Sequence, residues 1–98
     1  MSPERNHLFY IANLGSEVSR YLDCIVAGNT VESKRAWDRM EKIKTSLNAL
    51  TASQSAQAEI TCLFAFIAEP NCSQLPIQDI KRECADYFTP FALRLMAQ

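Results

Sequence analysis

The chain is poor in the residues that interrupt helices. Its 98 residues include two glycines and four prolines, too few for a sheet-rich or turn-rich fold of this length. With 48% hydrophobic and 21% charged residues, the composition is that of a globular protein, and disorder is not expected. A chain of this length is large enough for one hydrophobic core but not for two, so we expect a single domain over residues 1–98.

Long apolar runs and an excess of one charge are also missing. The longest strongly apolar stretch, Ile60 to Ala68, is far shorter than the roughly 20 residues that a membrane-spanning helix needs. Polar residues interrupt the apolar ones near the N-terminus, and no signal peptide is expected. The formal net charge is −1, so the chain lacks the excess of positive charge that would attract it to anionic lipid. These features predict a cytoplasmic protein without a membrane partner.

Residues that could act in catalysis or bind a metal are few and scattered along the sequence. His7 is the one histidine, and no nucleophile is placed beside it. Glu59 and Glu69 lack the E-x-x-H pairing of di-metal bundles and are interpreted as residues of helix ends. We therefore expect no enzyme, no cofactor and no metal site. The four cysteines contain no C-x-x-C pair and are predicted to be reduced thiols: Cys24, Cys62, Cys72 and Cys84.

Two stretches repeat apolar or small residues at alternating steps of three and four. This spacing places one residue per helical turn on a narrow face, along which one long helix packs against another. Such stripes indicate an all-α protein. The first stripe comprises Leu8, Ile11, Gly15, Val18, Leu22 and Ile25, and the second comprises Ala36, Met40, Ile43, Leu47 and Leu50.

Residues at the ends of the two stripes predict the limits of two helices. Proline after serine favours a helix start, so the first helix is expected over Pro3–Ala27. Gly28 can end it in the left-handed conformation, and Asn29 begins a variant capping box for a second helix over Thr30–Ala52. Because the connection is so short, the two helices should form an antiparallel hairpin.

Two further helices are expected in the second half of the chain. Ser53 or Ser55 should begin a helix of about fifteen residues that ends before Pro70. Pro76 should begin another helix. Thr89-Pro90 is interpreted as the start of a separate last helix, with a kink as the alternative. The predicted fold is a four-to-five-helix bundle built on the long hairpin.

Two single residues bear on packing and partners. Gly15 lies among small residues, which favours a close crossing with another helix of the same chain, or with a second subunit as the alternative. Trp37 lies beside the second stripe among charged residues. It is expected at the edge of the core, with a role as an anchor for a partner as the alternative.

The apolar surface of the first helix is wider than its stripe, because Phe9, Tyr10, Leu14 and Tyr21 lie outside it. A homodimer would cover such a surface; a monomer closed by its own last helix is the alternative. The expected function is that of a small interaction or regulatory protein. A small-molecule-binding bundle is an alternative. The expected interface residues are Leu14, Tyr21, Trp37, Phe91, Leu95 and Met96.

Nucleic acid is not the expected partner, although a DNA-binding regulator is a further alternative. The most basic segment, residues 34–44, is interleaved with acidic residues at helical spacing, as is typical of a solvated helix surface with local ion pairs. Residues 63–88 can be drawn as a helix-turn-helix. The charges on its second helix are net negative, which is unfavourable for contact with phosphates.

Overall fold

The computed structural model describes residues 3–50, 53–68 and 75–97, with side chains from Asn6 onward. These ranges form four helices and contain no strand, which confirms the all-α prediction. The helices are α1 (Pro3–Ala27), α2 (Thr30–Leu50), α3 (Gln54–Ala68) and α4 (Ile77–Met96). The predicted bounds of the first helix are those observed. The last residues of the predicted second helix, Thr51 and Ala52, lie outside the described ranges.

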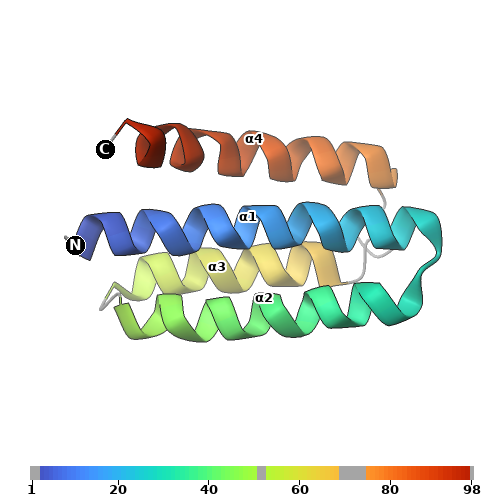
Figure 1. Ribbon diagram of the computed structural model, residues 1–98, viewed down its shortest axis with the longest axis horizontal. Helices are drawn as coiled ribbons and strands as arrows, with labels where there is room; N and C mark the ends of the chain where they lie inside the picture. The colour runs from blue at the N-terminus through green and yellow to red at the C-terminus, as the bar shows by residue number, and fades with distance from the viewer. Residues whose placement is uncertain (1–2, 51–52, 69–74, 98) are drawn as a thin grey trace.

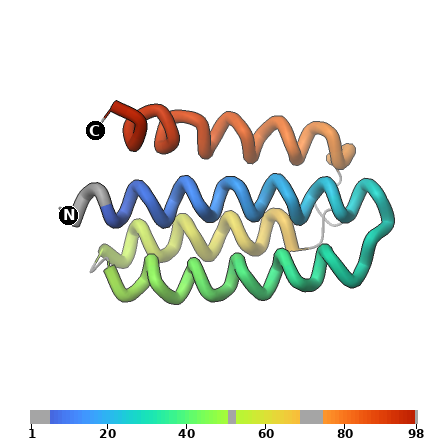
Figure 2. The backbone as a smooth tube through the Cα atoms, in the orientation of Figure 1, coloured from blue at the N-terminus to red at the C-terminus, as the bar shows by residue number. Residues whose placement is uncertain are grey.

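Successive helices run in opposite directions, so α1 begins and α4 ends at the same end of the bundle (Figure 1). The backbone trace shows α1 lying between α2 and α4 (Figure 2), and α1 packs closely against both of them. The third helix is held to its neighbours by longer side chains. The Phe64 ring of α3, for example, lies with its centroid 5.4 Å from that of Trp37 on α2.

The turn between α1 and α2 is determined by local backbone chemistry. Gly28 has φ +73°, a conformation that glycine adopts without a steric penalty. Its N–H donates to the carbonyl of Ile25, and the Asn29 N–H donates to the carbonyl of Cys24. This pair of hydrogen bonds is a Schellman motif, which satisfies carbonyl groups that the end of a helix leaves free. The predicted antiparallel hairpin is therefore present.

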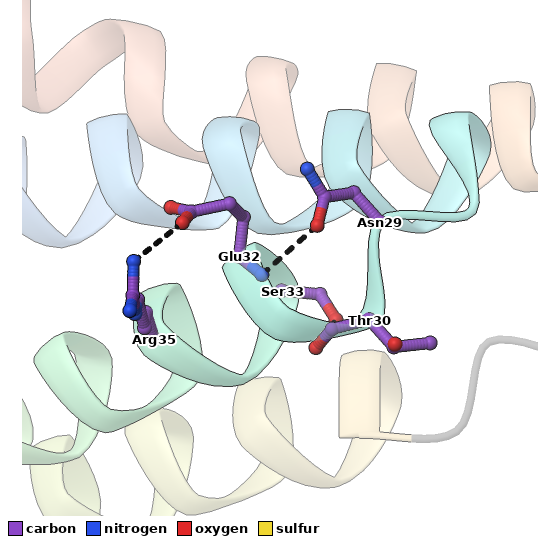
Figure 3. Close-up of polar contacts among 5 residues, drawn as sticks. All are labelled: Asn29, Thr30, Glu32, Ser33 and Arg35. Carbon is purple, nitrogen blue, oxygen red and sulfur yellow. Dashed lines mark hydrogen bonds and ion pairs between the residues drawn. The ribbon is translucent and has the colours of Figure 1, made fainter.

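Asn29 also begins α2, as predicted. Its Oδ1 accepts a hydrogen bond from the Glu32 N–H at 3.2 Å (Figure 3). The reciprocal half of a capping box is missing, because the Asn29 N–H is already bonded to α1. The Glu32 carboxylate instead accepts a hydrogen bond from Arg35 at 2.7 Å (Figure 3). One residue thus ends α1 through its backbone and caps α2 through its side chain.

The core is a single cluster to which all four helices contribute. The α1 stripe is buried at Leu8, Ile11, Val18 and Leu22, and the α2 stripe is buried at Ala36, Met40 and Leu47. The ends of the stripes, Ile25 and Leu50, are exposed. Buried residues of the other two helices are Ile60, Phe64 and Ile67 on α3 and Ile80, Cys84 and Phe88 on α4.

Leu14 and Tyr21 lie outside the α1 stripe and were expected to contact a second subunit, but both are buried within their own chain. Leu14 is 0% and Tyr21 6% exposed, and the Tyr21 hydroxyl donates to the carbonyl of Ala68 at 3.4 Å. A stripe of one residue per turn describes a helix with a single neighbour. Because α1 has neighbours on several sides, a wider arc of its surface is buried within its own chain.

The predicted break at Thr89-Pro90 is also wrong, because α4 continues without interruption through Pro90 to Met96. Pro90 has no N–H to donate to the preceding turn, and a proline inside a helix is unfavourable. Phe88 is buried and Phe91 packs against the core on the same side of the helix. Keeping both aromatic rings on the bundle requires helical geometry on each side of the proline, so tertiary packing prevails over the local signal.

At the crossing of α1 and α4, Gly15 lies directly against Phe88. A Cβ placed on Gly15 would be 2.8 Å from Cγ and 2.9 Å from Cβ of Phe88, closer than real side chains approach. The interpretation of Gly15 as a close crossing within the same chain is thus confirmed. The missing side chain lets these two helices approach more closely than larger residues would allow.

Gly15→Ala should therefore destabilise the protein, although alanine is the better helix former by about 1 kcal/mol. Overpacking against Phe88 costs about 1–3 kcal/mol, so we expect a net loss of about 1 kcal/mol or more in the free energy of unfolding. Urea denaturation followed by circular dichroism measures this. Ser16→Ala, one residue away at an exposed position, is the matched control and should not destabilise. A Gly15→Ala protein as stable as the wild type would contradict the crossing.

Pro90→Ala should have the opposite effect. A proline in a helix interior costs about 3 kcal/mol relative to alanine. It also restricts the unfolded chain, which favours folding by up to about 1 kcal/mol and partly offsets that cost. We expect the variant to be more stable by about 2 kcal/mol, measured in the same denaturation experiment. Pro76→Ala, at the start of α4, is the control and should change stability little. Equal or lower stability of Pro90→Ala would show that α4 is not continuous in solution.

Candidate functional site

The six expected interface residues do not form one surface. Leu14 and Tyr21 are in the core, which leaves neither accessible to a second chain. Phe91 packs partly buried against the core, and so does Trp37, whose ring lies with its centroid 5.3 Å from that of Tyr21. Trp37 therefore has the core-edge position that the sequence favoured. Leu95 is half-buried, and only Met96, at 80% exposed, projects mostly into solvent.

Small and apolar residues instead gather where α1 and α4 lie side by side. A groove of about 400 Å³ runs between the two helices, and none of its lining residues is charged. Exposed apolar side chains stand on the same helices near the end of the bundle where α1 begins. We call this surface the α1/α4 face. It comprises Phe9, Ala12, Gly15, Ser16 and Ser19 of α1 and Ala85, Thr89, Ala92, Leu93 and Met96 of α4.

Toward the opposite end, the groove continues into a hollow of about 360 Å³ that includes basic residues. Lys81 of α4 is paired with Asp23 of α1 across the groove. Arg82 is paired with Asp79 one turn earlier, at 2.8 Å. Both cations are therefore neutralised by the chain's own carboxylates. This part of the surface has polar groups but no unbalanced charge with which to recognise an anion.

A second groove, of about 330 Å³, lies between α3 and α4. Apolar side chains, among them Leu63 and Phe66, line it together with the carboxylates Glu59 and Glu83. The Tyr87 hydroxyl donates a hydrogen bond to Oε1 of Glu59 at 2.7 Å and so joins the two helices. Burial is the largest cause of a strongly raised pKa at Tyr87, and the hydrogen bond and negative charge of Glu59 add to it.

The same two residues border a smaller cavity of about 90 Å³ near the end of the bundle where α1 begins. All four helices contribute to its walls, with His7 from α1 and Asn48 from α2 as further polar residues. The Asn48 Oδ1 atom is buried and has no hydrogen-bond partner among the described residues. A buried acceptor without a donor is uncommon in folded proteins and calls for an explanation.

Sequence reasoning did not bring these polar residues together. His7 and Glu59 are isolated in the sequence, and Tyr87 belongs to no motif. Asn48 carries no motif and drew no attention. Because each residue comes from a different helix, no spacing within one helix could have related them. Their proximity depends on how the four helices pack.

The described cysteines are all free thiols. Cys62 is exposed, Cys24 is intermediate and Cys84 is buried. Burial, with a smaller contribution from the negative charge of Glu83, raises the pKa of Cys84 to about 11, so its thiol is protonated at neutral pH and a poor nucleophile. Cys72 and Glu69 lie outside the described residues, and the predictions made for them are not addressed.

The described residues form neither a metal-binding cluster nor a membrane-spanning helix. Over residues 3–50, 53–68 and 75–97, no group of three or more histidine, cysteine, aspartate or glutamate side chains is arranged to hold a metal ion. Within the same part of the chain, none of the helices combines the length and the apolar character that spanning a membrane requires.

Comparisons with known protein families, with curated proteins and with solved structures give no match. The function of this chain must therefore be argued from its own surfaces. Those that stand out are the α1/α4 face and the α3/α4 groove with its adjoining cavity. The first is uncharged and apolar, whereas the second combines apolar walls with carboxylates and an unpaired amide oxygen.

The burial of Tyr87, together with its hydrogen bond to Glu59, should make stability depend on alkaline pH. Tyr87 has a raised pKa in the folded protein, so the folded state keeps a proton that the unfolded chain loses above the ordinary tyrosine pKa of 10.0. This contribution is complete below that pH and is lost as the pH rises above it. We expect the free energy of unfolding to fall more steeply above that pH in the wild type than in Tyr87→Phe.

Urea denaturation at a series of alkaline pH values measures the difference. The Tyr21 pKa is raised by burial as well, so Tyr21→Phe serves as a comparison for a tyrosine without a carboxylate partner and should alter the slope less. Parallel pH profiles for the wild type and Tyr87→Phe would show that the Tyr87 hydroxyl is neither buried nor bonded to Glu59 in solution.

Proposed function

We propose that the protein is a small non-catalytic interaction or regulatory protein that associates with a second copy of itself through the α1/α4 face. The observation that supports this proposal is the exposure of large apolar side chains beside an uncharged groove. Phe9 is 49%, Leu93 60% and Met96 80% exposed. Exposed apolar surface of this kind is typical of places where another molecule binds, because contact removes it from water.

The spacing of the residues on this face suits a helical partner. On α1, Phe9, Ala12, Ser16 and Ser19 recur at steps of three and four. On α4, Ala85, Thr89, Ala92 and Met96 do the same. Each set therefore lies along one side of its helix, on the α1/α4 face. Small side chains in the middle of such stripes let a second pair of helices approach closely.

The face is also suited to pairing with a copy of itself. A two-fold interface uses the same patch on both subunits, so the patch must be complementary to itself. Phe9 lies near the start of α1 and Met96 is the last residue of α4, and these two helix ends lie at the same end of the bundle (Figure 1). The hollow beside Ser19 and Ala85 lies farther along. A two-fold axis across the middle of the face would set the projecting side chains of each copy against the hollow of the other.

The alternatives are less well supported by this surface. Nucleic acid is bound mainly through basic contacts to phosphate, and the lining of the α1/α4 groove includes no basic residue. The interface proposed here retains Met96 from the sequence-based expectation. It replaces the buried Leu14 and Tyr21 by Phe9, and the partly buried Trp37 and Phe91 have no role in it.

Light scattering coupled to size-exclusion chromatography tests the proposal. We expect the mass of two chains for the wild type at micromolar concentration and the mass of one folded chain for Phe9→Glu and for Met96→Glu. A charge in a closely packed apolar interface lacks a partner and is unfavourable there. Circular dichroism should show unchanged helicity, since both side chains are exposed.

Val31→Glu is the matched control, because Val31 is 61% exposed but lies on α2, away from the α1/α4 face. It should keep the mass of two chains. A wild-type mass of one chain would refute the homodimer. Dissociation by Val31→Glu to the same extent as by Met96→Glu would show that a different surface is responsible.

A further inference from the structure

The α3/α4 groove carries negative charge that the chain does not neutralise. Within the described residues, neither Glu59 nor Glu83 forms a salt bridge, although both border the groove. By contrast, most of the acidic residues on α1 and α2 are paired with a nearby lysine or arginine. These are Glu17 and Asp23 of α1 and Glu32 and Glu41 of α2, and Asp79 of α4 is paired as well.

The walls between these carboxylates are apolar and partly aromatic. Leu63 and Phe66 contribute from α3, and the Tyr87 ring contributes from α4. The volume of about 330 Å³ lies at the lower end of the range of roughly 300–1,000 Å³ that is usual for small-molecule sites. A groove with apolar walls and carboxylates at its rim is complementary to an organic cation.

The adjoining cavity adds an acceptor that lacks a donor. The cavity and the groove share Glu59 and Tyr87, and the unpaired Oδ1 belongs to Asn48 in the cavity wall. A cavity of about 90 Å³ holds only a few non-hydrogen atoms, so a single donor group inside it lies near all of its walls. His7 also borders the cavity.

We propose that this site binds a primary ammonium compound with an apolar tail. The ammonium group occupies the cavity beside Glu59 and donates to the Glu59 carboxylate and to the Asn48 Oδ1. The tail lies in the α3/α4 groove against Phe66 and Tyr87. An ammonium group has three donors and no acceptor, which matches walls that present a carboxylate and an amide oxygen. This site lies apart from the α1/α4 face and does not depend on dimerisation.

The proposal can be tested with 2-phenylethylammonium chloride and two matched compounds. 2-Phenylethanol has the same tail without the charge, and trimethyl-2-phenylethylammonium has the charge without N–H donors and with a larger head group. We expect the primary ammonium compound to bind with a dissociation constant on the order of 1 mM, since few atoms are buried. Both matched compounds should bind at least about tenfold more weakly, because a charge-assisted hydrogen bond is lost or excluded. Titration followed by NMR at near-neutral pH measures all three.

Variants of the full chain locate the site. Glu59→Gln should weaken binding of 2-phenylethylammonium by about tenfold or more, and Asn48→Leu by about fivefold. Asp86→Asn is the matched control, because Asp86 is an exposed acidic residue of α4 that borders neither the groove nor the cavity. It should change the dissociation constant by less than about twofold.

Several results would overturn the proposal. One is the absence of binding at about twenty times the expected dissociation constant. Another is that the alcohol or the trimethyl compound binds the wild type as tightly as the primary ammonium compound does. This comparison needs no variant of the protein. A third is an equal effect of Glu59→Gln and Asp86→Asn, which would indicate general charge attraction rather than a site.

Discussion

The contact between Gly15 and Phe88 determines how closely α4 packs against α1, the helix that also packs closely against α2. A glycine in the middle of α1 allows the Phe88 ring of α4 to lie against the backbone of α1. Glycine inside a helix is unfavourable by about 1 kcal/mol relative to alanine, so the chain gives up helix stability for a close approach. The position of α4, and with it the α1/α4 face, depends on this contact.

The bundle is consequently unequal on its two sides. On the α1/α4 side, small residues and a close crossing leave a shallow groove without charge. On the α3 side, the helices are joined through long side chains, such as the Trp37–Phe64 ring contact and the Tyr87–Glu59 hydrogen bond. Packing through long side chains leaves more space between backbones. The groove and the cavity that share Glu59 and Tyr87 lie on this side.

Helix limits proved to be largely local properties. The left-handed Gly28 and the Asn29 cap lie where the sequence predicts them, because they depend on residues within one or two turns. The Ser53 hydroxyl likewise accepts a hydrogen bond from the Ala56 N–H, at the predicted start of α3. Pro90 is the exception. Its local preference is to begin or kink a helix, but the rings on either side of it are held by the rest of the bundle.

The amino-acid sequence by itself determined the helical class, the hairpin and most helix ends, since turn chemistry and apolar periodicity act over short distances along the chain. The tertiary structure decided which faces are covered. Leu14 and Tyr21 are buried because α1 has several neighbours, a fact that one helix cannot encode by its spacing alone. The tertiary structure also decided which polar groups lie close together. His7, Asn48, Glu59 and Tyr87 come from four different helices, and only the packing of those helices brings their side chains around one cavity.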